Sequence, residues 1–292
     1  MTFHRHILMT DPSHFEVTYA INPWMKPTAW AQNPEDFRAK SRAAWDDLAA
    51  QLARIGFTID VIPAAPGLPD LVFPANAAVV FNGTALLARF RHPERRGEEP
   101  VLKRFFEGLK ARGLINDVRA LPEGVFHEGA GDCIWDAQRQ LFWAGYGPRS
   151  SEESLAHLRR TFGQETVGLE LRTAHFYHLD TCFCPLPGGE VLYYPGAFTP
   201  MSLAEITARV PADMRIAATV DEAATFSLNA VAYGRDVVMA PPPQRLRAVL
   251  EERGYRVNDV DLSSFMLSGG AAYCMTLRLD LRSQAAKKLA AE

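Results

Sequence analysis

Residues 125–173 read VFHEGAGDCIWDAQRQLFWAGYGPRSSEESLAHLRRTFGQETVGLELRT and contain one complete structural unit. Segments 125–137 and 140–147 are strand-like runs bounded by turn residues. Segment 150–163 has the apolar spacing of a helix, and 167–173 is again strand-like. The stretch therefore predicts the order strand, strand, helix, strand.

The same order recurs along the chain. A helix at 34–55 and a strand at 57–63 precede three further copies, whose predicted segments are 71–81, 85–90, 98–113 and 116–121; 176–186, 190–196, 202–210 and 215–220; and 226–234, 236–241, 242–254 and 256–262. The last strands, near 269–281, are expected to pair with residues 4–10 and close a ring.

Each copy has a polar residue at a similar place in its predicted first strand. These residues, followed by a cysteine near the end of the chain, are Asn22, Asn76, Glu128, His178, Asn229 and Cys274. A radial repeat has this spacing when each first strand points one polar side chain at a common axis. The alternative is an ordinary doubly wound sheet, in which such polar residues lie at turns or edges.

Composition and charge narrow the class of protein. The chain has 292 residues, 48% of them hydrophobic and 22% charged, with a formal net charge of −3. These values are typical of a globular protein with a sizeable core and show no basic footprint for nucleic acid. No apolar run is long enough for a membrane span, and the N-terminus lacks a secretory segment. We expect one cytoplasmic domain over residues 1–292.

The four cysteines predict neither a disulfide framework nor a metal site. They are Cys133, Cys182, Cys184 and Cys274, and none forms a Cys-x-x-Cys pair. Cys182 and Cys184 have no second ligand pair at zinc spacing, so both are expected to be small buried hydrophobes. No nucleotide-binding glycine motif follows a predicted strand. We therefore expect no metal and no cofactor.

Several motifs in order resemble the guanidino-group-modifying superfamily, also called penteins, which includes arginine deiminase, dimethylarginine dimethylaminohydrolase, arginine dihydrolase and the amidinotransferases. The motifs are INPWM (21–25), PDLVFPANAAVV (69–80), HEGAGDC (127–133), YHLDTCF (177–183) and GGAAYCMTLRL (269–279). Each is weak alone, but together they span nearly the whole chain. The resemblance implies an α/β fold, a five-bladed α/β propeller of repeated strand-strand-helix-strand units around a central active site.

The resemblance also implies a catalytic set. Cys274 matches the family nucleophile, His178 the general acid and base, and Glu128 the carboxylate that orients this histidine. A cationic guanidinium near the sulfur would favour the thiolate. Asp180 lies two residues beyond His178 in a predicted strand, so period-two alternation points both side chains to one pocket, where the carboxylate of Asp180 accepts guanidinium N–H groups.

Asp180 and Asn76 distinguish this chain from some of its relatives. Dimethylarginine hydrolases resemble it at PDLVF and Cys274 but carry a lysine at the position of Asp180, while arginine deiminases carry an aspartate at the position of Asn76. An amide can hold either a guanidinium or a neutral ureido group. Asn22 and Asn76 match active-site asparagines of arginine dihydrolases, which convert arginine to ornithine, carbon dioxide and two ammonia molecules.

Other matches concern the amino-acid end of the substrate. Arg95 and Arg149 match positions that bind the α-carboxylate, and Asp70 is a candidate for the α-ammonium, although a turn-capping role is equally compatible. The family's acidic-Gly-Gly-Asp motif is one residue longer here, which leaves the role of Asp132 open.

The sequence thus predicts a hydrolase of a free guanidino amino acid acting through a covalent cysteine adduct, with arginine dihydrolase as the leading interpretation. Arginine deiminase, citrulline hydrolase and dimethylarginine dimethylaminohydrolase are alternatives within the superfamily. A non-catalytic amino-acid sensor on the same scaffold is the alternative outside it. The expected partner is a small-molecule substrate, and the sequence leaves a homo-oligomer open.

Overall fold

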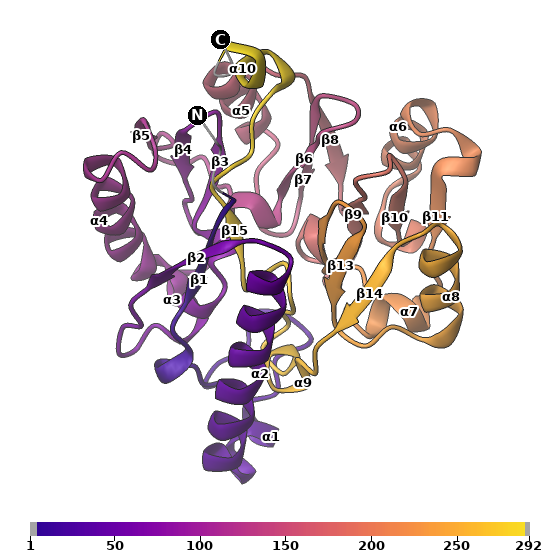
Figure 1. The fold of residues 1–292 in the computed structure, drawn as a ribbon. Helices are drawn as coiled ribbons and strands as arrows, with labels where there is room; N and C mark the ends of the chain where they lie inside the picture. Colours follow the sequence, from indigo (N-terminus) through magenta and orange to yellow (C-terminus); the bar gives the residue numbers. More distant parts are fainter. Residues whose placement is uncertain (1–4, 290–292) are drawn as a thin grey trace.

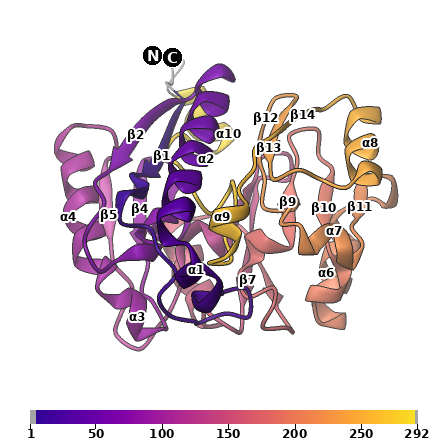
Figure 2. The same cartoon turned by 90° about the horizontal axis from the view of Figure 1, so that it is seen from below.

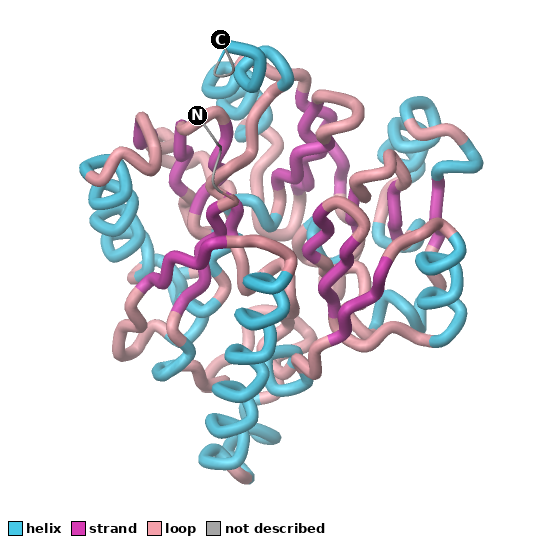
Figure 3. Tube along the Cα trace, in the orientation of Figure 1, coloured by secondary structure: helices cyan, strands magenta, loops and turns pink. Residues whose placement is uncertain are grey.

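The computed structural model describes residues 5–289, which form a mixed α/β fold with five three-stranded sheets (Figures 1 and 3). In each sheet the middle strand pairs antiparallel with one neighbour and parallel with the other. The sheets are β15-β1-β2 (Leu277–Arg278, His6–Thr10, Thr58–Ile62), β3-β4-β5 (Ala78–Phe81, Thr84–Leu87, Asp117–Arg119), β6-β7-β8 (Cys133–Asp136, Leu141–Tyr146, Thr166–Glu170), β9-β10-β11 (Phe183–Pro185, Val191–Tyr193, Arg215–Ala217) and β12-β13-β14 (Val231–Tyr233, Asp236–Met239, Arg256–Asp259).

The first sheet joins the two ends of the described chain. Strand β15 pairs antiparallel with β1, with Ile7 opposite Arg278 and Leu8 opposite Leu277. The predicted pairing of the last strands with the N-terminal segment is thereby confirmed for residues 7 and 8, whereas residue 4 of that segment lies outside the described residues. Helix α2 (Pro34–Arg54) then connects β1 to β2, so this sheet repeats the order of the other four.

A helix connects the two parallel strands of every sheet. Besides α2, these connecting helices are α4 (Glu98–Ala111), α5 (Ser154–Phe162), α6 (Pro200–Arg209) and α8 (Gln244–Glu252). In Figure 1 α4, α5, α6 and α8 lie on the outside and the strands lie toward the middle. Shorter helices are α1 (Pro27–Gln32), α3 (Pro93–Arg96), α7 (Val220–Ala224), α9 (Ser263–Met266) and α10 (Gln284–Leu289).

Local sequence explains why these helices begin and end where they do. The Asn33 side chain accepts a hydrogen bond from the amide of Asp36, and Pro34 occupies the first helical position of α2. Helix α5 buries Leu155, Leu158 and Phe162 on one face. It ends at Gly163, which adopts a left-handed conformation with φ of 62°.

The five first strands share one hollow. A cavity of about 80 Å³ is lined by residues of β3, β6, β9, β12 and β15, among them Val80, Cys133, Phe183 and Leu277. Asp180 also lines it. Seen from below in Figure 2, α4 lies at the left edge and α6 and α8 lie at the right edge, with strands between them. Within residues 5–289 we find no helix that combines the length and hydropathy of a membrane span.

One sequence-based prediction is wrong in a consistent way. Three of the six repeated polar residues, expected within first strands, lie in, or directly before, short 3₁₀ turns that precede those strands. Asn76 ends the turn Pro74–Asn76, Glu128 caps Gly129–Gly131, and His178 caps Leu179–Thr181. The carbonyl of His178 accepts bonds from both the amide and the hydroxyl of Thr181, which closes a turn in place of a strand.

Candidate active site

Five of the six repeated positions meet in the interior. Asn76, Glu128, His178, Asn229 and Cys274 are each at most 2% exposed. Each comes from a turn just before the first strand of a different sheet, so segments about fifty residues apart converge. The sixth, Asn22, lies in a loop and donates a hydrogen bond to the carbonyl of Ser268, shortly before Cys274.

One side of this cluster is built on the carboxylate of Glu128. Its Oε2 lies 2.8 Å from Nε2 of His178 and 2.9 Å from Nη1 of Arg149. Burial opposes ionisation, but Arg149 and His178 outweigh it, so the pKa of Glu128 lies below its usual range. Burial lowers the pKa of His178 to about 4. His178 is therefore neutral near pH 7, and its Nε2 hydrogen faces the ionised carboxylate.

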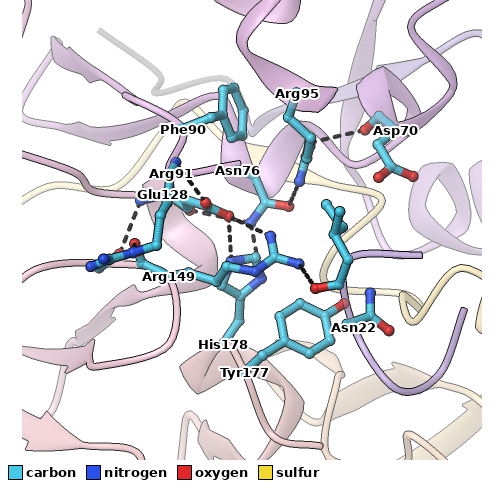
Figure 4. A network of polar contacts seen from close by, with 12 residues as sticks. Asn22, Asp70, Asn76, Phe90, Arg91, Arg95, Glu128, Arg149, Tyr177 and His178 are labelled. Carbon is cyan, nitrogen blue, oxygen red and sulfur yellow. Dashed lines mark hydrogen bonds and ion pairs between the residues drawn. The ribbon is translucent and has the colours of Figure 1, made fainter. Parts of the chain in front are cut away.

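The other nitrogen of His178 faces Asn76. Nδ2 of Asn76 lies 3.4 Å from Nδ1 of His178 and donates to the carbonyl of Glu128 at 3.2 Å. Oδ1 of Asn76 accepts a bond from Nη1 of Arg95 at 2.8 Å. Figure 4 shows Asn76 between the Glu128–His178 pair and Arg95. The amide is thus fixed with its NH₂ group toward the histidine.

The two arginines expected at the substrate carboxylate are buried and already engaged by protein carboxylates. Arg95 makes two hydrogen bonds of 2.8 Å to Glu98 and one of 3.0 Å to the carbonyl of Asp70, and its guanidinium lies over Phe90. Arg149 pairs with Glu128 and lies 4.7 Å from the ring centroid of Tyr177 (Figure 4). Arg95 thus helps to fix Asn76, and Arg149 helps to fix Glu128.

The other side of the cluster surrounds the sulfur of Cys274. Its thiol donates to Oδ2 of Asp180 at 3.1 Å, and Nδ2 of Asn229 donates to the sulfur at the same distance. Burial, followed by the charge of Asp180, raises the pKa of the Cys274 thiol well above its usual value. Without a cation beside it, the sulfur therefore stays protonated.

Asp180 is only half satisfied. Within residues 5–289 its buried Oδ1 has no hydrogen-bond partner, and burial raises the pKa of the carboxyl to about 7. Gly131 lies between Asp180 and Asn76. A Cβ at this position would clash with Nδ2 of Asn76 and would lie 3.6 Å from Oδ2 of Asp180. This glycine lets the histidine side and the sulfur side of the cluster approach each other.

Asp70 and Asp132 have defined protein partners. Asp70 accepts bonds from Tyr19 at 2.8 Å and from Ser268 at 2.9 Å. Asp132, whose role the sequence left open, accepts a bond from Ser150 at 2.6 Å and another from the amide of Leu179. Asp132 therefore fixes the turn that carries His178 and Asp180.

His178 and Asp180 do not share a strand face. Their turn directs the imidazole to Glu128 and the carboxylate to Cys274, so period-two alternation was the wrong reason for placing them in one site. Sequence reasoning assigned no function to Asn229, although its place in the repeat was the available signal. Within residues 5–289 no group of three or more His, Cys, Asp or Glu side chains is arranged to hold a metal ion.

Comparison with known proteins gives a consistent result. The family model for eukaryotic N,N dimethylarginine dimethylhydrolase matches residues 11–281. The bifunctional arginine dihydrolase/ornithine cyclodeaminase ArgZ of Synechocystis sp. is 39% identical over 273 residues, which cover 94% of this chain but only 37% of that protein. The N(G),N(G)-dimethylarginine dimethylaminohydrolase of Mycobacterium tuberculosis is 35% identical over 94% of this chain and 86% of its own.

A solved structure resembles the whole site-bearing region. The N-terminal domain of ArgZ, an arginine dihydrolase from the ornithine-ammonia cycle in cyanobacteria, was crystallised as a cysteine-to-serine variant bound to substrate. It matches with a TM-score of 0.88 and 36% identity, covering 95% of this chain and 99% of that one. The present chain thus corresponds to one part of the longer cyanobacterial protein.

Proposed function

The chain belongs to the N,N dimethylarginine dimethylhydrolase family, and we propose that it hydrolyses the guanidino group of free L-arginine to L-ornithine, carbon dioxide and two ammonia molecules. The main support is the carboxylate of Asp180, which lies beside the sulfur of Cys274. Its Oδ1 is buried and has no hydrogen-bond partner among residues 5–289. A buried acceptor without a partner is costly, and guanidinium N–H groups satisfy it.

The cation also activates the nucleophile. In the ligand-free site, burial and Asp180 keep the thiol of Cys274 protonated. A guanidinium bound against Asp180 adds a positive charge beside the sulfur and favours both the thiolate and the ionised carboxylate. The substrate thereby supplies the charge that the sulfur side of the cluster lacks.

We infer two rounds of attack at one carbon. The thiolate of Cys274 attacks the central guanidinium carbon, one terminal nitrogen leaves as ammonia, and a covalent thiouronium remains. Water adds to this carbon and the thiolate leaves, giving a ureido group. The thiolate then attacks the ureido carbon, and the other terminal nitrogen leaves as ammonia. A second water releases this carbon as carbon dioxide, and Nε of arginine remains as the side-chain amine of ornithine. Arginine and two waters thus balance the products.

His178 would move the protons in both rounds. It is neutral at rest, its Nε2–H is held by Glu128, and its Nδ1 lone pair faces the interior beside Asn76. Nδ1 can take a proton and give it to a departing amine, then accept one from an attacking water. Arg149 keeps Glu128 ionised throughout, so the imidazolium that forms has a counter-charge.

The fold supports a closed site of this kind. We infer that the five sheets are the blades of an α/β propeller, that residues 1–292 act as one domain, and that the active site lies at one end of the shared hollow. In this arrangement Asn22 and Asp70 border the site through Ser268, next to the glycine pair before Cys274. Arg95 and Arg149 act on the substrate chiefly by holding Asn76 and Glu128.

Product analysis tests the proposal. With L-arginine we expect ornithine and about two ammonia per turnover, measured by mass spectrometry and an ammonia assay, and no activity from Cys274→Ser. Citrulline as the only product would identify a deiminase instead.

Asn76 supplies a sharper form of this test. Asn76→Asp keeps the acceptor for Arg95 but replaces the N–H donor that faces Glu128 and His178 by a second negative oxygen. Because carboxylates hold a guanidinium but leave a ureido group unsatisfied, we expect citrulline to accumulate. An unchanged ratio of citrulline to ornithine would contradict the role of Asn76.

Dimethylarginine hydrolysis is the second candidate. The family model and the 35% identity to the mycobacterial enzyme favour it. Asp180 argues against it, because a dimethylated nitrogen has no hydrogen to donate to the free Oδ1. Competition between arginine and asymmetric dimethylarginine decides the matter: release of dimethylamine in preference to ammonia would reverse the assignment.

A further inference from the structure

We propose that Asn229 is a catalytic residue, which holds the nucleophilic cysteine by its backbone and stabilises its thiolate through the side-chain amide. The inference deepens the proposed function, because it takes Cys274 as the nucleophile. The first observation in its favour is the position of Asn229 beside the sulfur of Cys274. Asn229 is fully buried, and among the repeated polar residues within 5–289 it alone makes a hydrogen bond to the sulfur of Cys274.

Hydrogen-bond partners fix the orientation of the Asn229 amide. Its Oδ1 lies 3.1 Å from the backbone nitrogen of Cys274, which can only donate. Its Nδ2 lies 3.1 Å from the carbonyl oxygen of Asp180, which can only accept. A flipped amide would lose both bonds. The group that faces the sulfur of Cys274, also at 3.1 Å, is therefore an N–H donor.

Asn229 also braces the turn that carries the nucleophile. Its backbone carbonyl accepts a hydrogen bond from the amide of Tyr273 at 3.2 Å, and its side chain accepts the next amide, that of Cys274. Two consecutive N–H groups are thus held by one residue. Phe226, which begins the loop before Asn229, has φ of 55°, and its carbonyl accepts the amide of Asn229. The loop is shaped to present this asparagine.

The two polar neighbours of the sulfur favour opposite protonation states. Asp180 accepts the S–H hydrogen and so favours the thiol, whereas the N–H of Asn229 gains strength when the sulfur becomes negative. Asp180 is the titratable group that raises the pKa of the Cys274 thiol, and burial keeps the nearby phenol of Tyr177 neutral. Once a guanidinium neutralises Asp180, the bond from Asn229 remains to hold the thiolate.

The pH dependence of alkylation of Cys274 tests this directly, because alkylation needs no turnover. Asn229→Asp conserves shape but puts a negative acceptor against the sulfur, so we expect the thiol pKa to rise by about one unit or more. Asn229→Ser, which is smaller and keeps a hydroxyl, should give a smaller rise. The rate at a fixed pH near 8 should fall about tenfold or more in Asn229→Asp, as read from the alkylated Cys274 peptide by mass spectrometry.

Asn116→Asp is the matched control, since it makes the same chemical change at an exposed position. It should leave the thiol pKa unchanged. A merely structural role would lower the melting temperature of the Asn229 variants without moving the thiol pKa, and that result would overturn the inference. If the wild-type protein does not consume arginine but the Asn229 variants shift the thiol pKa, the proposed function fails while the inference stands.

Discussion

The histidine side and the sulfur side of the cluster differ in how their charges are balanced. On the histidine side, Glu128 is paired with both Arg149 and His178 at 2.9 and 2.8 Å. On the sulfur side, Asp180 pairs with no cation of the described part of the chain and leaves one oxygen unpaired there, and its neighbour Cys274 keeps its proton. Both sides are buried to the same degree.

This difference shows what each side contributes. A compensated buried carboxylate can hold a histidine rigidly through a reaction, because its charge is already balanced. A buried carboxylate without a counter-charge can instead bind a cation, because the cation balances its charge. On the histidine side, the charge of Glu128 is already balanced by Arg149 and His178. On the sulfur side, Asp180 still needs a cation, which a guanidinium would supply.

The largest loss of activity should come from a substitution on the histidine side of the cluster. Glu128→Gln removes the charge that balances Arg149 and orients His178, so we expect at least a hundredfold loss of kcat and a loss of about 3 kcal/mol of folding stability. Steady-state kinetics and denaturant unfolding measure the two effects.

Glu98→Gln is the control, because it breaks the other buried arginine–glutamate pair, with Arg95, and leaves the His178–Glu128 contact intact. It should cost similar stability and less kcat than Glu128→Gln, since its effect reaches the site only through Arg95 and Asn76. Equal losses of kcat in the two variants would show that Glu128 acts through folding alone.

A smaller effect, of opposite sign for two reagents, is expected from Asp180→Asn. Because the charge and hydrogen bond of Asp180 both raise the pKa of the Cys274 thiol, the variant should react about tenfold faster with neutral iodoacetamide near pH 7. The variant should react more slowly with a cationic haloacetamidine, because the carboxylate of Asp180 that would attract this cation is gone. The exposed Asp213→Asn should change neither rate. Parallel changes with both reagents would contradict the receptor role of Asp180.

The smallest effect is a proton released on binding. The carboxyl of Asp180 has a pKa raised to about 7 by burial, so near pH 6 it is largely protonated in the free protein. A bound guanidinium favours the ionised form, and arginine should therefore bind Cys274→Ser more weakly as pH falls from 7 to 6. Calorimetry in two buffers of different ionisation enthalpy measures the released proton. Affinity independent of pH would mean that Asp180 does not face the ligand.

The same pKa shifts give folding stability a defined pH dependence. For Asp180 the folded-state pKa lies above the unfolded value near 4, so its stabilising contribution is present at low pH and is lost as pH rises through about 7. For His178 the folded-state pKa of about 4 lies below its unfolded value, so its contribution is lost as pH falls from about 6.5 toward 4. Asp180→Asn should remove the loss of stability between about pH 4 and pH 7 that Asp180 causes and keep the contribution of His178, as measured by denaturant unfolding across this pH range.

The sequence predicted the regular elements well because their signals are local. The helix expected at 150–163 is α5, Ser154–Phe162, and the strand expected at 167–173 overlaps β8, Thr166–Glu170. Apolar periodicity and a glycine at the end of the helix suffice for such assignments. The pairing of β15 with β1 also followed, since the repeat left one sheet incomplete.

The turns before the first strands could not be predicted in the same way. Thr181 bonds back to the carbonyl of His178, and Gly129 adopts φ of 66°, which makes short turns where apolar runs suggested strands. These turns decide that His178 faces Glu128 while Asp180 faces Cys274. The role of Asn229 depends on contacts across 45 residues, which no local pattern encodes.

Oδ1 of Asp180, which has no partner among residues 5–289, is the proposed receptor for the substrate guanidinium. A crystal structure of Cys274→Ser with L-arginine tests this role most directly. We predict guanidinium N–H groups on Oδ1 of Asp180, with the central carbon between residue 274 and the ring of His178. Arginine bound elsewhere, with Oδ1 of Asp180 still unpaired, would contradict it.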